Sequence, residues 1–89
     1  MTEREANKYF TFSIAARRTG LSTRTVRRYV RRGLVNRTLT EEELAELRRI
    51  RRLTSLGINL AGVEIILRMR RQIEELQAHI ARLEARLTQ

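Results

Sequence analysis

The residues with the most evident chemistry in this chain lie in one basic stretch, residues 21–35, which reads LSTRTVRRYVRRGLV. The stretch holds five arginines and no acidic residue. A guanidinium group offers a planar fork of N–H donors, which clamps phosphate oxygens or bridges a guanine edge. The stretch is therefore a candidate site for binding a polyanion, provided that a folded element holds its like charges on an exposed surface.

The spacing of these residues predicts an amphipathic helix with a basic ridge. Four arginines fall within a stripe roughly 100° wide on a helical wheel, and they form the arginine ridge: Arg24, Arg27, Arg28 and Arg31. Val26 and Val30 lie on the opposite side, where a core would be, and Thr25 and Tyr29 flank the ridge. A DNA major groove admits an α-helix, and phosphates would offset the repulsion between the arginines. The alternative is an ordinary helical hairpin whose charges are only solvated.

Position along this helix assigns the expected roles in DNA binding. Arg24, Arg27 and Arg28 come early and are expected to reach base edges, whereas Arg31 and Arg32 come later and are expected to meet phosphate. Three hydroxyl residues at the helix start are expected to donate to phosphate, helped by the free amides there: Ser22, Thr23 and Thr25.

Local signals for capping and turns predict how this helix is positioned. Thr11 is placed to cap a helix over residues 12–19, and Gly20 supplies a tight turn after it. Ser22 is a good N-cap for the basic helix, and Gly33 ends that helix. A small residue, a glycine and an aliphatic residue follow one another at the spacing of a helix-turn-helix: Ala16, Gly20 and Val26.

Two further helices are predicted in the second half of the chain. Thr40 and Glu43 have the spacing of a capping box for a third helix, which reaches about residue 56 and is closed by Gly57. Asn59 is placed to cap a fourth helix that continues nearly to residue 89. Four apolar residues at the start of this last helix are expected to pack on the third helix as core: Leu60, Val63, Ile65 and Ile66.

The last helix carries a heptad pattern that predicts a coiled-coil dimer. Seven apolar residues recur at alternating spacings of three and four, and they form the apolar seam: Ile66, Met69, Ile73, Leu76, Ile80, Leu83 and Leu87. Two copies that bury this seam would form a symmetric homodimer and hold two basic helices at a fixed separation, which suits a palindromic site. The alternative is a single helix that folds back on its own domain.

Composition and charge narrow the classes of function. The net charge is +9, with ten basic residues against two acidic ones in residues 1–39 and nine against eight in residues 40–89. This concentration in the first half favours a polyanion partner. The chain has no cysteine, His79 is its only histidine, and no carboxylate pair suggests acid–base catalysis. We therefore expect that the protein is not an enzyme and that it binds no metal ion and no cofactor. No run approaches the length of a membrane span, and a cytoplasmic, nucleoid-associated protein is expected.

The stretch FSIAARRTGLSTRTVRRYVRRGLV, followed by LTEEELAELRRIRRLTSLGINLAGVEIIL, resembles the MerR family of transcription regulators. The resemblance implies a winged helix-turn-helix, a helical pair and a long dimerisation helix whose two copies run antiparallel. The seam itself points the other way, because isoleucine at heptad position a with leucine at position d is typical of parallel dimers. The family usually reads T-[LI]-R-Y-Y-E in its recognition helix, where residues 25–30 here read TVRRYV. Arg27 and Tyr29 match and carry over as expected DNA contacts, whereas Arg28 and Val30 depart from the pattern.

Two branches of the family are similar to this chain, and they differ in partner. SIAARRTGL and GINLAG resemble the heat-shock repressor HspR branch, which implies dimers on inverted-repeat operators and a response to a chaperone. GINLAGVEIIL also resembles CbpM, a modulator of a DnaJ-like co-chaperone, which implies protein binding instead. Only residues 35–39 stand where members carry a wing hairpin, so the wing is expected to be reduced, with Arg37 and Thr38 touching phosphate. The short wing slightly favours the CbpM branch, and the arginine ridge favours DNA more strongly.

The expected fold class is all-α: a MerR-like helix-turn-helix with a reduced wing, a helical pair and a long C-terminal coiled-coil dimerisation helix. The expected divisions are a flexible arm over residues 1–8, a DNA-binding domain over 9–58 and a dimerisation helix over 59–89. The predicted function is sequence-specific transcription regulation by a homodimer on a palindromic operator. The alternatives are a chaperone-modulating interaction module without DNA binding and a basic architectural or RNA-binding protein. The predicted DNA-binding residues are Ser22, Thr23, Arg24, Thr25, Arg27, Arg28, Tyr29, Arg31, Arg32 and Arg37.

Overall fold

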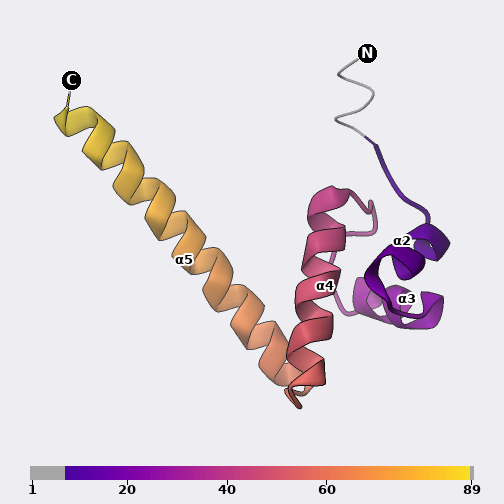
Figure 1. Cartoon of the computed structure of the whole chain (residues 1–89). Helices are drawn as coiled ribbons and strands as arrows, with labels where there is room; N and C mark the ends of the chain where they lie inside the picture. The colour runs from indigo at the N-terminus through magenta and orange to yellow at the C-terminus, as the bar shows by residue number, and fades with distance from the viewer. Residues whose placement is uncertain (1–7, 89) are drawn as a thin grey trace. The chain divides into compact units, whose positions relative to one another are not determined.

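The computed structural model describes residues 8–88, and this part of the chain contains four helices (Figure 1). They are α2 (Phe12–Thr19), α3 (Thr23–Arg31), α4 (Glu41–Ser55) and α5 (Leu60–Leu87). Residues 8–88 hold no strand, and the one isolated bridge in this range is antiparallel and joins Phe10 to Leu39. The all-α fold class expected from the sequence is confirmed. The arm expected over residues 1–8 lies outside the described residues, apart from Lys8.

The helix-turn-helix forms where the caps were predicted. The Thr11 hydroxyl accepts a hydrogen bond from the amide of Ile14 at 3.1 Å, and α2 ends at Gly20, whose φ of 77° favours glycine. At the start of α3 the hydroxyl of Ser22 accepts from the amide of Thr25 at 3.0 Å. α2 packs against both α3 and α4 (Figure 1), so it is the central helix of this unit.

The end of α3 turns the chain back toward its own last turn. Gly33 has a φ of 78°, and the amide of Leu34 donates to the carbonyl of Tyr29 at 3.0 Å. The amide of Gly33 donates to the carbonyl of Val30, also at 3.0 Å, which completes a Schellman motif. Leu34 and Val35 are thereby buried immediately after the helix.

The predicted capping box at the start of α4 is wrong. Thr40 is the N-cap, but its side chain makes no capping hydrogen bond. Glu43 reaches backward instead, and its carboxylate accepts from the backbone amide of Asn36 at 2.8 Å and from its Nδ2 at 3.2 Å. Glu43 therefore fastens the loop that precedes α4 rather than the helix end itself.

The neighbouring Glu42 carboxyl is exposed and has a lowered pKa. The main cause is a hydrogen bond from the backbone amide of Glu42, and the second is a hydrogen bond from the Thr40 hydroxyl. Both lower this pKa below its usual value of 4.5.

The chain divides into two compact units between Ile58 and Asn59. In the first unit the buried apolar side chains come from all three helices and the loop between α3 and α4: Ala15, Ala16, Val26, Tyr29, Leu34, Val35, Leu39, Leu44, Leu47 and Ile50. They belong to elements separated by short loops, so a core is built within fewer than sixty residues. This core fixes the orientation of α3.

The second unit consists mainly of α5, which begins at the Asn59 cap with its side chain accepting from the amide of Gly62 at 2.9 Å. Its buried residues are Val63 and Leu67, while Ile65, expected to belong to the core, is 51% exposed. Residues four apart share a helix face, whereas residue 65 lies about 200° from residue 63 and therefore on the opposite side. Among residues 8–88, no helix is long and apolar enough to cross a bilayer.

Candidate nucleic-acid interface

The arginine ridge lies on the exposed face of α3. All four of its side chains are exposed, while Val26 is fully buried on the opposite face. The helix extends from Thr23 to Arg31, so spacings of three and four place the four guanidinium groups along one side over two turns. Arg32, at the C-cap, is exposed as well. The result is a positively charged surface on a helix whose other side is held in the core.

Tyr29 occupies a different place from the one expected, because it is buried with only 4% of its surface exposed instead of flanking the ridge. Val30, expected to anchor the helix beside Val26, is only partly buried. On a helical wheel Tyr29 lies about 60° to one side of Val26 and Val30 about 40° to the other. The larger aromatic ring occupies the core, and the guanidinium of Arg28 lies 5.7 Å from its centroid.

Only 4% of the Tyr29 surface is exposed, so little of this side chain is open to a ligand. A contact between Tyr29 and DNA stays a prediction.

Phe12 is an additional residue of this surface that was not identified from the sequence. The guanidinium of Arg27 lies 5.5 Å from the centroid of the Phe12 ring, within the range of a cation–π contact. Phe12 opens α2 and is partly buried, whereas Arg27 stands in the middle of α3. The contact therefore crosses the helix-turn-helix and restrains one arginine of the ridge. No local sequence signal identifies such a pair, since it depends on how the two helices pack.

The hydroxyl groups at the start of α3 are already joined to each other. The Ser22 hydroxyl accepts from the Thr25 amide as a cap and donates to the Thr25 hydroxyl at 2.9 Å. The Thr25 hydroxyl therefore keeps its own hydrogen for an outside acceptor, whereas the hydrogen of Ser22 is committed. Ser22 is exposed, and Thr23 and Thr25 are partly buried. Of the three predicted phosphate donors, Thr25 has the clearest donor capacity.

The loop between α3 and α4 stands where a wing would be. It is tied down at both ends, because the amide of Phe10 donates to the carbonyl of Leu39 at 2.8 Å and Asn36 is held by Glu43. Arg37 and Thr38 are exposed between these two attachments. The described residues contain no β-hairpin here, so the wing is reduced, as expected. Arg37 remains the cation that this loop presents to solvent.

The described residues offer no metal chemistry to accompany these cations. No group of three or more histidine, cysteine, aspartate or glutamate side chains in residues 8–88 is arranged to hold a metal ion. His79 is exposed on α5, where its Nδ1 lies 3.4 Å from an amino nitrogen of Arg82. The chemistry of the α3 surface is therefore that of arginine and hydroxyl donors facing solvent, which suits an acceptor-rich polyanion.

Comparison with known proteins identifies the family. The sequence pattern of the family described as MerR HTH family regulatory protein matches residues 10–70. The chain is also 36% identical over 92 residues to a Streptomyces coelicolor protein named "Putative heat shock protein HspR", an alignment that covers 93% of this chain and 61% of the relative. The chain thus spans 61% of the length of that relative. No solved structure matches this chain significantly. Because the family pattern covers more than half of the chain, from the bridge residue Phe10 into α5, this chain belongs to the MerR family of helix-turn-helix regulatory proteins.

Proposed function

We propose that this MerR-family regulator binds a palindromic DNA operator in a sequence-specific manner as a homodimer. The observation that carries the proposal is the arginine ridge, exposed along α3 and fixed from behind by Val26 and Tyr29. A helix held in this way enters a major groove without rearrangement of the core. Arginine is suited to both parts of the interface, because its fork pairs with guanine edges and with phosphate oxygens.

The proposed contacts follow from the position of each side chain on α3. Arg24, Arg27 and Arg28 stand on the first two turns and read bases, whereas Arg31 and Arg32 bind phosphates. Contacts to phosphate position a protein on the duplex, and contacts to base edges carry sequence preference. Ser22, Thr23, Thr25 and Arg37 extend the phosphate contacts at either end of the helix.

The proposed homodimer rests on the apolar seam of α5. Six of its seven residues are between 42% and 85% exposed: Met69, Ile73, Leu76, Ile80, Leu83 and Leu87. Burying a side chain of this size stabilises a structure by about 1.5–3 kcal/mol before the cost of ordering it. A second copy of α5 buries the seam of both chains at once, and a two-fold axis then sets the spacing of the two α3 helices for a palindrome.

A role in the heat-shock response is part of the proposal. The name of the Streptomyces coelicolor relative describes a heat shock protein, and the alignment covers 93% of this chain. We propose that this chain regulates stress genes on the nucleoid of the cytoplasm, with a chaperone as the source of its signal. The response itself is tested by comparing transcription before and after heat shock in cells with and without the gene.

Fluorescence anisotropy with labelled duplex DNA tests the proposed binding. A pool of random duplexes is first enriched by repeated selection on the protein, and the enriched duplex is then titrated at several salt concentrations with unlabelled competitor. Specific binding should persist under excess random competitor, and its affinity should fall steeply with salt because phosphate contacts release counterions. Binding that every duplex displaces equally would contradict sequence specificity and would favour an architectural or RNA-binding role.

The reduced wing favours a second candidate function, which is a chaperone-modulating module without DNA binding. The loop over residues 36–38 is fastened by Glu43 and offers little backbone for phosphate contacts. The same titration separates the two functions, since the interaction module would not bind any duplex even at low salt. Binding of a purified DnaJ-like co-chaperone, measured by calorimetry, would then be the positive result for this alternative.

A further inference from the structure

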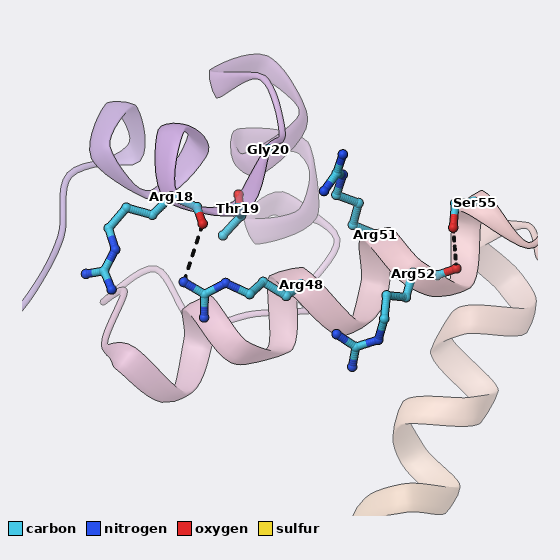
Figure 2. Close-up of a pocket in the computed structure, with 7 residues that line it drawn as sticks. All are labelled: Arg18, Thr19, Gly20, Arg48, Arg51, Arg52 and Ser55. Carbon is cyan, nitrogen blue, oxygen red and sulfur yellow. Dashed lines mark hydrogen bonds between the residues drawn. The ribbon is translucent and has the colours of Figure 1, made fainter.

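A second basic site lies in the first unit, in a pocket between α2 and α4 (Figure 2). The pocket has a volume of about 510 Å³. One wall is the C-terminal end of α2 with Arg18, Thr19 and Gly20, and the other is a face of α4 with Arg48, Arg51 and Arg52. None of these arginines belongs to α3, so the pocket is distinct from the arginine ridge.

The positive charge of this pocket is only partly compensated. Arg18 forms an ion pair with Glu41 at 3.2 Å. Arg48 donates to the carbonyl of Arg18 at 3.4 Å, as Figure 2 shows. Within the part of the chain that the structure describes, no carboxylate forms a salt bridge with Arg48, Arg51 or Arg52. An anion bound in this pocket would offset part of this positive charge.

The geometry of the pocket leaves the guanidinium groups as its available donors. The Thr19 hydroxyl donates to the carbonyl of Ala15 at 2.7 Å, and the Ser55 hydroxyl donates to the carbonyl of Arg52 at 2.7 Å. Both hydroxyl hydrogens are therefore used within the protein. A ligand in this pocket meets cationic N–H donors, and the matching partner is a group rich in anionic acceptor oxygens.

Gly20 brings one of these guanidinium groups against the backbone of the helix-turn-helix. A Cβ atom at this position would stand 2.8 Å from both Cζ and Nη1 of Arg51, closer than such atoms approach in proteins. The absence of a side chain at Gly20 therefore lets the Arg51 guanidinium lie beside the turn. A side chain at position 20 would displace the Arg51 guanidinium from this place.

We propose that this pocket binds phosphate, and that its volume suits a ligand with two linked phosphate groups. Small-molecule sites typically have volumes of about 300–1,000 Å³, and the pocket falls in this range, whereas a single phosphate would fill little of it. The phosphate groups come either from a free small molecule or from the DNA backbone, since the chemistry of recognition is the same. The inference goes beyond DNA recognition by α3, because binding of a free phosphate compound requires no DNA.

Calorimetry with inorganic pyrophosphate tests the pocket on the full chain. The pocket variant is Arg51→Gln with Arg52→Gln, and the matched control is Arg68→Gln with Arg71→Gln, which removes the same charge from exposed positions of α5. We expect the wild type and the control to bind pyrophosphate, and the pocket variant to bind it at least about tenfold more weakly. Circular dichroism during heating establishes that all three proteins are folded.

Anisotropy with duplex DNA identifies the source of the phosphate. If the ligand is a free small molecule, pyrophosphate binds the wild type and the pocket variant keeps its DNA affinity. If it is the DNA backbone, the pocket variant lowers the slope of log affinity against log salt by about 2. The proposal is overturned if the pocket variant matches the control in both assays. Failure of the wild type to bind DNA would count against DNA regulation alone, since the pyrophosphate titration still decides the pocket.

Discussion

α3 and α5 expose surfaces of opposite chemistry, one charged and one apolar. α3 is nine residues long, buries Val26 and Tyr29 within its own unit and exposes a row of arginines. α5 is 28 residues long, buries only Val63 and Leu67, and exposes an apolar seam along most of its length. The charged face of α3 suits an anionic partner, and the apolar face of α5 suits another apolar surface.

This difference shows what helical periodicity does and does not determine. The same 3.6-residue repeat gives both helices two faces, but it does not say what covers each face. For α3 the core of the first unit covers the apolar side, and the polar side is the proposed DNA interface. For α5 the apolar side itself is the proposed interface, and each of the following experiments changes one of these faces while leaving the other intact.

The largest expected effect comes from placing charge in the apolar seam. Leu76→Lys with Ile80→Lys removes four apolar side chains from a symmetric dimer and buries four cations, so the dissociation constant of the dimer should rise at least about 100-fold. Sedimentation equilibrium measures this change. The control, Ala78→Lys with Ala85→Lys, adds the same charge on the face away from the seam and should leave the dimer intact. A wild type that sediments as a monomer at micromolar concentration would contradict the comparison.

The buried side of α3 should give the next largest effect. Tyr29→Ala removes a core ring and should lower the free energy of unfolding by about 3–5 kcal/mol, whereas Val30→Ala should lower it by less than about 1.5 kcal/mol. Urea denaturation followed by circular dichroism measures both, at one protein concentration because the proposed dimer would add to the apparent stability. Equal losses from the two substitutions would mean that the valine anchors α3 after all.

The contrast between these two residues also shows where sequence analysis reaches its limit. The bounds of α2 and the caps Thr11 and Ser22 were predicted correctly because a cap depends on residues three or four positions away. Tyr29 and Val30 lie on either side of Val26 on the wheel, so only the tertiary packing around α3 decides which one is buried. The hydrophobic pattern therefore predicted a core face but not its centre.

Contacts between distant residues were the other part that could not be predicted. Glu43 bonds to Asn36 seven residues earlier instead of capping its own helix, because the short loop brings that amide within reach. Arg48 meets the carbonyl of Arg18 across thirty residues, which places arginines of two helices around one pocket. In both cases the residue types were visible in the sequence, but the partner depended on the tertiary fold.

Two substitutions on the exposed side of α3 should distinguish proposed contacts to base edges from proposed contacts to phosphate. Arg27→Ala should cost about 1–3 kcal/mol of discrimination between the selected duplex and random DNA, because it removes the proposed base contact. Arg31→Ala should weaken binding to all duplexes and lower the salt slope by about 1, because it removes the proposed phosphate contact. Anisotropy titrations against both kinds of duplex at three or more salt concentrations distinguish these outcomes. Identical effects from the two variants would show that the arginines of the ridge share one role.

The smallest expected effect tests whether the ridge is held in place before DNA arrives. Phe12→Leu keeps an apolar side chain but removes the ring that lies 5.5 Å from the Arg27 guanidinium. The cation–π contact is worth about 0.5–1 kcal/mol at an exposed site, so specific affinity should fall by about two- to fivefold. The same substitution made in the Arg27→Ala protein should change affinity very little, because the contact is already absent. An equal loss in both backgrounds would mean that Phe12 acts through the stability of α2, and that Arg27 adopts its position only on the DNA.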